Sequence, residues 1–328
     1  MFRIPGRQPR FSMTAFPTLR SAHRTKFQRP FTLSGCRPFA MTDTHSIDYE
    51  GRYEYWEAGV AWELREPSLR HEWPRSRLAQ LIGDIGRMRG APIALLGTTG
   101  LQERDARGTR VRAVQADELV SLDWRYGLPD VFVVGELPLP DVVFEVDLTT
   151  DIRDRKLDVY AAWGIPELWV EVPDADMPSK RKRSGLAIFL LDDGTFRESA
   201  ESAAFPTLSA REIHAALNEP STSAATVETV RRVGGIMGRR AGTGPDDDPF
   251  LSVERQLSRR EGQRQGHREG HREGRTFMLE GLLRARGIDI TPTSRAEADR
   301  IAALPQDRIL RAALDSTDSD DFLSRLRP

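Results

Sequence analysis

The sequence predicts a mixed α/β fold, in which a β-sheet core is flanked by helices. Three observations lead to this prediction: an amphipathic helical pattern over residues 74–88, several short apolar segments of strand length after it, and a second helical pattern among those segments. Strands interspersed with helices in this way are typical of α/β proteins. In the first helix, apolar side chains recur every three or four residues, at Leu78, Leu81, Ile82, Ile85 and Met88.

The remaining elements follow in order along the chain. The segments that we expect to be strands cover residues 91–97, 109–115, 131–134, 142–148, 168–172 and 186–191. A helix is expected over residues 151–163, and Gly164 fits the position after its last turn because glycine readily adopts the left-handed conformation. Asp192, Asp193 and Gly194 predict a tight hairpin turn into a further strand.

Composition excludes several classes of protein. The 328 residues include 48 Lys and Arg and 49 Asp and Glu, so the formal net charge is −1 and the chain is not a globally basic nucleic-acid binder. Cys36 is the only cysteine, which excludes a disulfide framework, a cysteine-rich zinc site and an iron–sulfur cluster and suits a reducing compartment. No apolar run approaches the ~20 residues of a membrane helix. We therefore expect a soluble, cytoplasmic protein with no membrane partner.

The beginning of the chain differs from the rest. Residues 1–41 hold eight Lys or Arg and no Asp or Glu. Acid-free, arginine-rich segments occur in organelle transit peptides, but this one lacks a clear amphipathic helix. We therefore favour a disordered basic leader over residues 1–44, or an upstream start that precedes Met41 as the true first residue.

Three further segments follow from composition. Residues 45–218 carry the helical and strand patterns, and we expect them to form the folded domain. Residues 219–250 are rich in Ser, Thr, Gly, Pro and Asp, which predicts a flexible linker. Residues 251–328 are expected to be helical, with an Arg/Glu/Gly repeat followed by a small helical module.

The repeat, over residues 259–275, contains no apolar residue. Its four glycines cost a helix roughly 4 kcal/mol relative to alanine, so we expect at best a marginal, solvated helix. Alternatively, the glycines permit close helix approach in a homo-oligomer. His267 and His271 lie one helical turn apart, and we interpret them as part of the solvated surface because no third metal ligand is evident.

The strand segment 142–148 carries an unusual row of acids. Alternation along a strand places Asp141, Glu145 and Asp147 on one face and Val142 and Phe144 on the other. A buried carboxylate is unfavourable without a positive partner. That face is therefore either exposed to solvent or holds a hard divalent cation, which prefers carboxylate oxygens.

Lys156 is a second anomaly. On a helical projection of residues 151–163, it falls within the apolar stripe formed by Ile152, Val159 and Trp163. An ammonium group in that stripe needs an anionic partner, and the acids of the preceding strand are the nearest candidates. An exposed acid, or a lysine that extends past its neighbours to water, explains each feature alone. Taken together, the two features favour a shared site.

Residues 129–173 resemble a known family. Two strand segments open with Pro-Asp, at Asp130 and Asp141, and the second continues as Val-Val-Phe-Glu-Val with Glu145. The next helix contains Lys156 and Tyr160 as Lys-x-x-x-Tyr, and Gly-Ile-Pro-Glu-x-Trp-Val follows it. This order is similar to that of the Uma-two-type restriction endonucleases, which belong to the PD-(D/E)XK nuclease superfamily.

The resemblance covers roughly residues 53–217 and is loose at its start. There, Tyr53, Glu54 and Gly59 resemble the opening Tyr-Glu-…-Gly of the family. His71 resembles a histidine that follows it, and we interpret His71 as structural. The resemblance implies a restriction endonuclease-like mixed β-sheet core flanked by helices, with a C-terminal helical tail.

The resemblance also implies a function, a metal-dependent endonuclease that hydrolyses phosphodiester bonds of DNA with Mg²⁺, or Mn²⁺, as cofactor. Asp130 and Glu145 would hold the metal, with the backbone carbonyl of Val146 as a further ligand. Lys156 would assist the attacking water. Additional candidates at the site are Asp141, Asp147 and Tyr160.

Local basic clusters supply candidate phosphate contacts, since binding of nucleic acid requires cationic side chains near the acidic site. They are Arg110, Arg112, Lys180, Arg181, Lys182 and Arg183. Solvated charged surface explains each cluster equally well. Asp147 stands where the superfamily usually has a lysine, which motivates an alternative: a catalytically inactive nuclease-like module that binds nucleic acid or protein.

Overall fold

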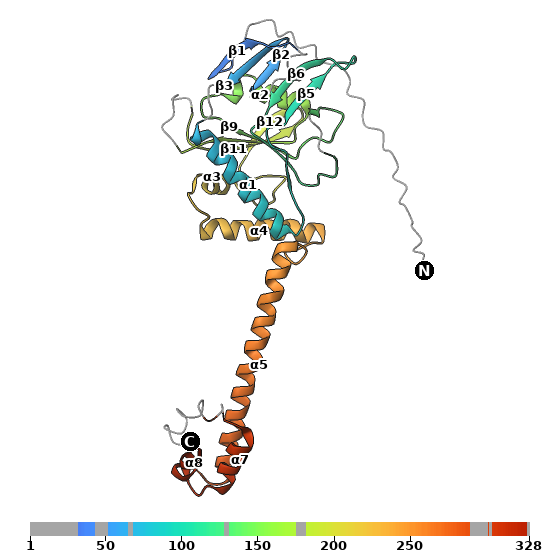
Figure 1. The fold of residues 1–328 in the computed structure, drawn as a ribbon. Coiled ribbons are helices and arrows are strands. Elements are labelled where there is room, and N and C mark those ends of the chain that lie inside the picture. The colour runs from blue at the N-terminus through green and yellow to red at the C-terminus, as the bar shows by residue number, and fades with distance from the viewer. Residues whose placement is uncertain are drawn as a thin grey trace, which may run out of the picture.

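The computed structural model describes residues 32–42, 52–64, 68–127, 131–174, 182–288, 301 and 304–326. The elements are, in chain order, β1 Cys36–Ala40, β2 Tyr55–Glu57, β3 Val60–Leu64, α1 Leu69–Arg89, β4 Ala94–Leu95, β5 Gly100–Arg104, β6 Arg110–Gln115, β7 Glu118–Ser121, β8 Phe132–Val133, β9 Val142–Val146, the 3₁₀ turn η1 Ile152–Asp154, α2 Lys156–Trp163, β10 Glu167–Val172, β11 Gly185–Asp192, β12 Thr195–Ser199, α3 Ala210–Asn218, α4 Ala224–Ala241, α5 Pro249–Ala285, α7 Gln306–Asp315 and α8 Ser319–Leu326. The expected mixed α/β fold is confirmed (Figure 1).

Two mixed sheets make up the body of the protein. The larger core is built on the sheet of order β12-β11-β10-β9-β7-β4, in which β9 and β10 are parallel and the other neighbours are antiparallel. The second sheet has the order β1-β3-β2-β6-β5-β8. Parallel neighbours require a crossover connection, and α2 supplies it between β9 and β10. This crossover brings α2 against the sheet at the strand that carries Glu145.

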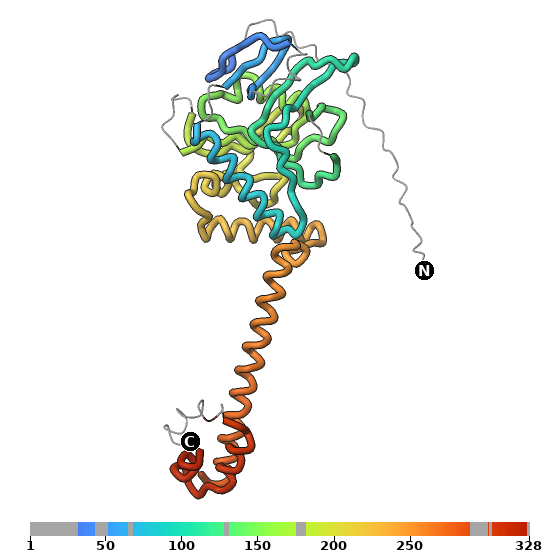
Figure 2. The backbone as a smooth tube through the Cα atoms, viewed as in Figure 1, coloured from blue at the N-terminus to red at the C-terminus, as the bar shows by residue number. Residues whose placement is uncertain are grey.

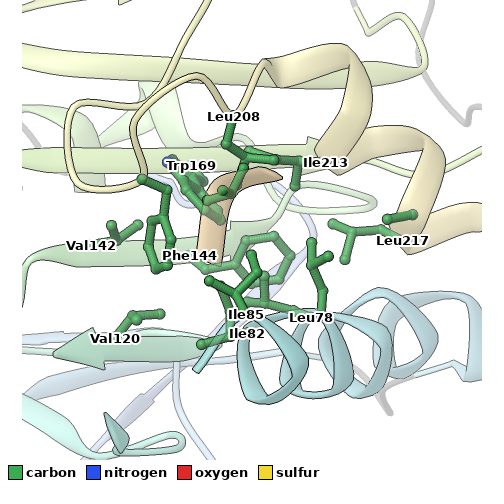
Figure 3. Packing of buried hydrophobic residues seen from close by; sticks show 14 of the residues in the cluster. Leu78, Ile82, Ile85, Val120, Val142, Phe144, Trp169, Leu208, Ile213 and Leu217 are labelled. Atoms are coloured by element: carbon green, nitrogen blue, oxygen red, sulfur yellow. The ribbon is translucent and has the colours of Figure 1, made fainter. Parts of the chain in front are cut away.

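Both faces of β9 are buried, so its alternation separates two cores. Val142, Phe144 and Val146 belong to the cluster with Leu78, Ile82 and Ile85 of α1, which Figure 3 shows together with Trp169 and side chains of α3. On the opposite face, Val143 packs in the cluster that contains Val159, Tyr160 and Trp163 of α2 and side chains of the second sheet. The side chain of Glu145 therefore lies buried beside α2.

The prediction of a disordered leader over residues 1–44 is wrong for the end of that segment. Residues 36–40 form β1, which pairs antiparallel with β3. The strand is anchored by Leu33 and Met41, both 2% exposed, and the indole Nε1 of Trp56 donates a hydrogen bond to the Met41 carbonyl. The partner of β1 lies 20 or more residues further along the chain, so the local sequence of this basic segment contains no pattern that predicts a strand. Residues 1–31 and 43–51 lie outside the described part of the chain.

The expected flexible linker is also wrong, because most of residues 219–250 form the helix α4. Ser223 caps the start of this helix by accepting a hydrogen bond from the Thr226 amide, and Gly242 ends it with φ +72°. Val230 and Val233 pack in the same core as α1. Two glycines of this segment, Gly234 and Gly238, lie where α4 packs closely on α1. Figures 1 and 2 show the two helices crossing.

Residues 251–328 are largely helical in the described part, as expected. Asp248 caps α5, and the helix continues through the glycine repeat and extends away from the body (Figure 2). At its far end Leu279 and Leu283 pack with α7 and α8 in a separate small core. Self-association through this segment stays a prediction, which light scattering of chains with and without it tests. No helix among the described residues is long and apolar enough to span a membrane.

Candidate active site

Lys156 is the first residue of α2, and the chain just before it sets its direction. Asp151 begins the η1 turn by accepting a hydrogen bond from the Arg153 amide at 3.1 Å. Gly164 ends α2 in the left-handed conformation, with φ +82°, as its position in the sequence predicted. With both ends fixed, the buried side of α2 presents Val159, Trp163 and Lys156 to the core. Lys156 is 3% exposed.

Replacing Asp151 by alanine should destabilise the protein by about 1 kcal/mol at neutral pH, the usual cost of a lost helix cap. The hydrogen bond from Arg153 lowers the pKa of Asp151. This contribution is therefore present above the ordinary pKa of aspartate and is lost as the pH falls through the lowered value. Urea unfolding across acidic pH should show the two proteins converge. Asp151→Asn, which keeps a cap, should lose less, and an equal loss in both variants would contradict the capping role.

The ammonium of Lys156 lies between two carboxylates, Glu145 on β9 and Glu54 just before β2 of the other sheet. Its Nζ is 2.6 Å from Glu54 Oε2, and 3.0 and 2.8 Å from Glu145 Oε1 and Oε2. It also donates to the Gln115 carbonyl at 3.4 Å. The hydroxyl of Tyr160, one turn along α2, donates to Glu145 Oε1. The structure thus brings together Glu145, Lys156 and Tyr160 and adds Glu54.

Asp117 extends this cluster with a third buried carboxylate. It lies between β6 and β7, where its Oδ2 accepts a hydrogen bond from the Val146 amide at 2.6 Å. Its Oδ1 accepts from the guanidinium of Arg52, whose Nε is 3.7 Å from Glu54 Oε1. His71 Nε2 lies 3.6 Å from Asp117 Oδ2. The centre therefore combines three carboxylates with two permanent cations and one histidine.

Burial and these neighbours shift the protonation equilibria at the centre. Burial raises the pKa of Glu145; the Lys156 charge opposes this rise, and the carboxylates of Asp117 and Glu54 add to it. Burial disfavours the charge on Lys156, yet Glu145, Glu54 and Asp117 together raise its pKa above the ordinary value. Burial also raises the pKa of Tyr160 well above its usual range. Lys156 is therefore held as a cation, and Tyr160 as a neutral donor.

The structure places Asp141 and Asp147 in interactions outside this centre. Asp141 Oδ2 accepts a hydrogen bond from the Leu122 amide at 2.7 Å and so joins the end of β7 to the start of β9. Asp147 pairs with Lys182, with 3.1 Å between Oδ1 and Nζ. Val146 contributes its amide to Asp117. Asp130 lies outside the described residues, and its role as a metal ligand stays a prediction.

The candidate phosphate contacts that the structure describes are mostly engaged within the protein. The Arg110 guanidinium lies 3.8 Å above the Trp56 ring and is 6% exposed. Arg112 bridges Glu57 and Glu103, at 3.0 and 3.2 Å. Lys182 is held by Asp147, whereas Arg183 is exposed. Lys180 and Arg181 lie outside the described residues.

Sequence reasoning missed the roles of Glu54, Asp117 and Arg52. Glu54 was noted only as part of a loose resemblance, and Asp117 reads as a turn residue between two strands. Lys156 and Glu54 are 102 positions apart in the sequence, so no local spacing links them. The available signal was indirect: Lys156 in an apolar stripe requires an anionic partner, but the stripe does not identify which acid supplies it.

The donor chemistry at the centre fits Mg²⁺, which prefers oxygen ligands and is held by only one or two carboxylates while it keeps several waters. Glu54 Oε1 is buried and accepts no hydrogen bond. Glu54 and Glu145 already share one cation, the Lys156 ammonium. The described residues contain no group of three or more His, Cys, Asp or Glu side chains arranged around one ion. Of the carboxylate oxygens of Glu54 and Glu145, Glu54 Oε1 is the one that is not already occupied by a hydrogen bond.

The fold and the site define a mixed α/β protein with a buried carboxylate–lysine centre at the crossover between two parallel strands. No family model and no curated protein matches the chain. Among solved structures, the chain is similar to a protein from Anabaena variabilis described as a "putative nuclease belonging to DUF820". The TM-score is 0.34 and the identity 9%, over 59% of this chain and 99% of that one.

The two mixed sheets flanked by helices agree with the mixed α/β class expected from the sequence. The narrower assignment to the Uma-two type stays a prediction. The function proposed below rests on the geometry of the centre itself.

Proposed function

We propose that the protein is a metal-dependent endonuclease that hydrolyses phosphodiester bonds of DNA. The observation that carries this proposal is the convergence of Glu145 and Glu54 on the ammonium of Lys156, with Asp117 beside them. Adjacent carboxylates and a fixed cation are the groups needed to hold a divalent ion next to a reacting phosphate.

The residues of the centre have distinct roles in this proposal. Glu145 and Glu54 would hold Mg²⁺ or Mn²⁺, with Asp130 and the Val146 carbonyl as further predicted ligands. When bound, the ion supplies Lewis-acid polarisation of the phosphate and a bound water of lowered pKa. Lys156 presents a permanent positive charge beside the carboxylates, where it stabilises negative charge that develops on phosphoryl oxygens.

Two residues position this machinery. The hydroxyl of Tyr160 donates to Glu145 Oε1 and so fixes the orientation of the carboxylate. Asp117 holds the end of β9 through the Val146 amide and is itself held by Arg52. Both interactions lie inside the core, so the carboxylate of Glu145 has little rotational freedom before substrate arrives.

One observation favours a second candidate function. Glu54, Glu145 and Lys156 are 2, 4 and 3% exposed, and the two carboxylates already neutralise the lysine. A phosphodiester must reach these groups if they are catalytic. The alternative is therefore a catalytically inactive module that binds nucleic acid or protein, with the ion cluster as a purely structural link between the two sheets.

Cleavage of plasmid DNA by the full chain with Mg²⁺ or Mn²⁺ separates the two functions. We expect cleavage by the wild type and a decrease of at least about 100-fold in Glu145→Gln, since loss of a metal ligand removes several kcal/mol of transition-state stabilisation. The matched control is Glu171→Gln. Glu171 is an equally buried glutamate on the neighbouring strand β10 that binds His214 and Asn218 of α3 instead.

Circular dichroism of both variants confirms that each is folded. Cleavage that persists in folded Glu145→Gln rejects this site. DNA retention by the wild type without cleavage in either metal supports the inactive binding module.

A further inference from the structure

A second cluster of metal-ligating side chains lies on α5, outside the candidate active site. His267 and His271 are both exposed, and their Nε2 atoms are 2.9 Å apart. Their rings are nearly perpendicular, with an interplanar angle of 86° and 4.2 Å between centroids. The pair lies in the glycine repeat, in the part of α5 that extends away from the body (Figure 2).

The separation of the two nitrogens suits a shared metal ion. A metal–imidazole bond is about 2.0–2.1 Å long, which places two ligand nitrogens on one ion about 2.9–3.4 Å apart for angles between a right angle and a tetrahedral one. In the absence of metal one ring must donate its Nε2 proton to the other. With the proton on Nδ1 in both neutral rings, both Nε2 atoms carry a lone pair that can bind a metal ion.

We propose that His267 and His271 chelate one late transition-metal dication of the class Zn²⁺, Ni²⁺ or Cu²⁺. Imidazole nitrogens select these ions over Mg²⁺ and Mn²⁺, which prefer oxygen. Both side chains are exposed, so water completes the coordination shell and a third protein ligand is not required.

Because the pair lies within the glycine repeat, a bound ion would stabilise the helical form of this part of α5. The chelate spans Gly270 and has Gly266 and Gly274 on either side, where each glycine weakens the helix by about 1 kcal/mol relative to alanine. Two ligands one turn apart can bind one ion together only while that turn is helical. Metal binding is therefore coupled to helix formation in the repeat, and the connection between the body and the C-terminal module stiffens when the ion is bound.

Calorimetric titration of the full-length, untagged protein with Ni²⁺ and with Zn²⁺ tests the site. We expect one ion per chain and at least a tenfold loss of affinity in His267→Gln and in His271→Gln, each of which leaves one ligand. The control is His214→Gln, which removes a histidine of α3 and should bind the ion as the wild type does.

Hydrogen exchange gives a second readout that does not depend on enzymatic activity. With the metal at about 100 times its Kd, amides around residues 266–274 should exchange up to about 100-fold more slowly, because the ion binds only the helical form. Absence of binding by the wild type overturns the proposal. Binding that persists unchanged in both His267→Gln and His271→Gln also overturns it.

Discussion

Replacing Lys156 by methionine should destabilise the protein by about 3–5 kcal/mol at neutral pH, the usual cost of removing one partner from a buried ion pair. Methionine preserves most of the side-chain length but leaves Glu54 and Glu145, 2 and 4% exposed, without the ammonium that binds both. Urea unfolding measures the loss.

The loss should also depend on pH. Burial raises the pKa of Glu145 even beside Lys156, and removal of the cation raises it further. Folded protein then holds a proton that the unfolded chain releases above the ordinary pKa of glutamate, so the variant loses stability as the pH rises. In the wild type the pKa of Glu145 is raised to about 8, so the two folded proteins differ in bound protons only around and above that pH. The difference from the wild type should therefore be smaller near pH 7 than near pH 9.

Arg37→Met is the control for an exposed ion pair. Arg37 binds Glu63 at 3.1 Å, and their side chains are 74 and 34% exposed. Its loss should cost no more than about 1 kcal/mol. The double variant Lys156→Met/Glu145→Gln should recover part of the stability, because glutamine is neutral without taking up a proton on folding. A loss in Lys156→Met as small as in Arg37→Met would contradict a buried centre.

Replacing Gly234 by alanine should destabilise the protein by about 1–3 kcal/mol through overpacking between α4 and α1. A Cβ at this position would lie 2.5 Å from the Met88 Cβ and 2.8 Å from the Ile85 carbonyl oxygen. Neither atom is the end of a flexible side chain, so the two helices would have to separate. Thermal or urea unfolding measures the change.

The adjacent glycine provides a matched control of opposite sign. At Gly235 the nearest atom to an added Cβ is the end of the Arg239 side chain, at 3.4 Å, which can move. Gly235→Ala should therefore stabilise the protein by up to about 1 kcal/mol through helix propensity. If both alanine variants stabilised the protein equally, α4 would not pack on α1 as described.

Local patterns were sufficient for the elements around the centre. Alternation along β9 correctly placed Glu145 opposite Phe144, and helical spacing correctly placed Lys156 in the buried stripe of α2. The turn at Gly194 joins β11 and β12 as predicted. In each case the pattern is set by the geometry of one element, so that neighbouring residues alone determine it.

Predictions made from composition were wrong where contacts between distant segments of the chain determine the structure. Gly234 lies in the segment whose Ser, Thr, Gly, Pro and Asp content predicted a linker, but close packing on α1 requires a residue without a side chain there. Similarly, β1 has no strong strand pattern, and its pairing with β3 defines it.

The sequence by itself determined the mixed α/β class, the buried face of β9 and the need of Lys156 for an anionic partner. Tertiary structure alone decided which acids meet that need: Glu54 comes from the segment before β2 and Asp117 from the connection between the two sheets, whereas Asp141 and Asp147 bind Leu122 and Lys182. The reason is that side-chain direction follows from local backbone geometry, but the partner of a buried charge is chosen by how separate segments pack, which no local spacing encodes.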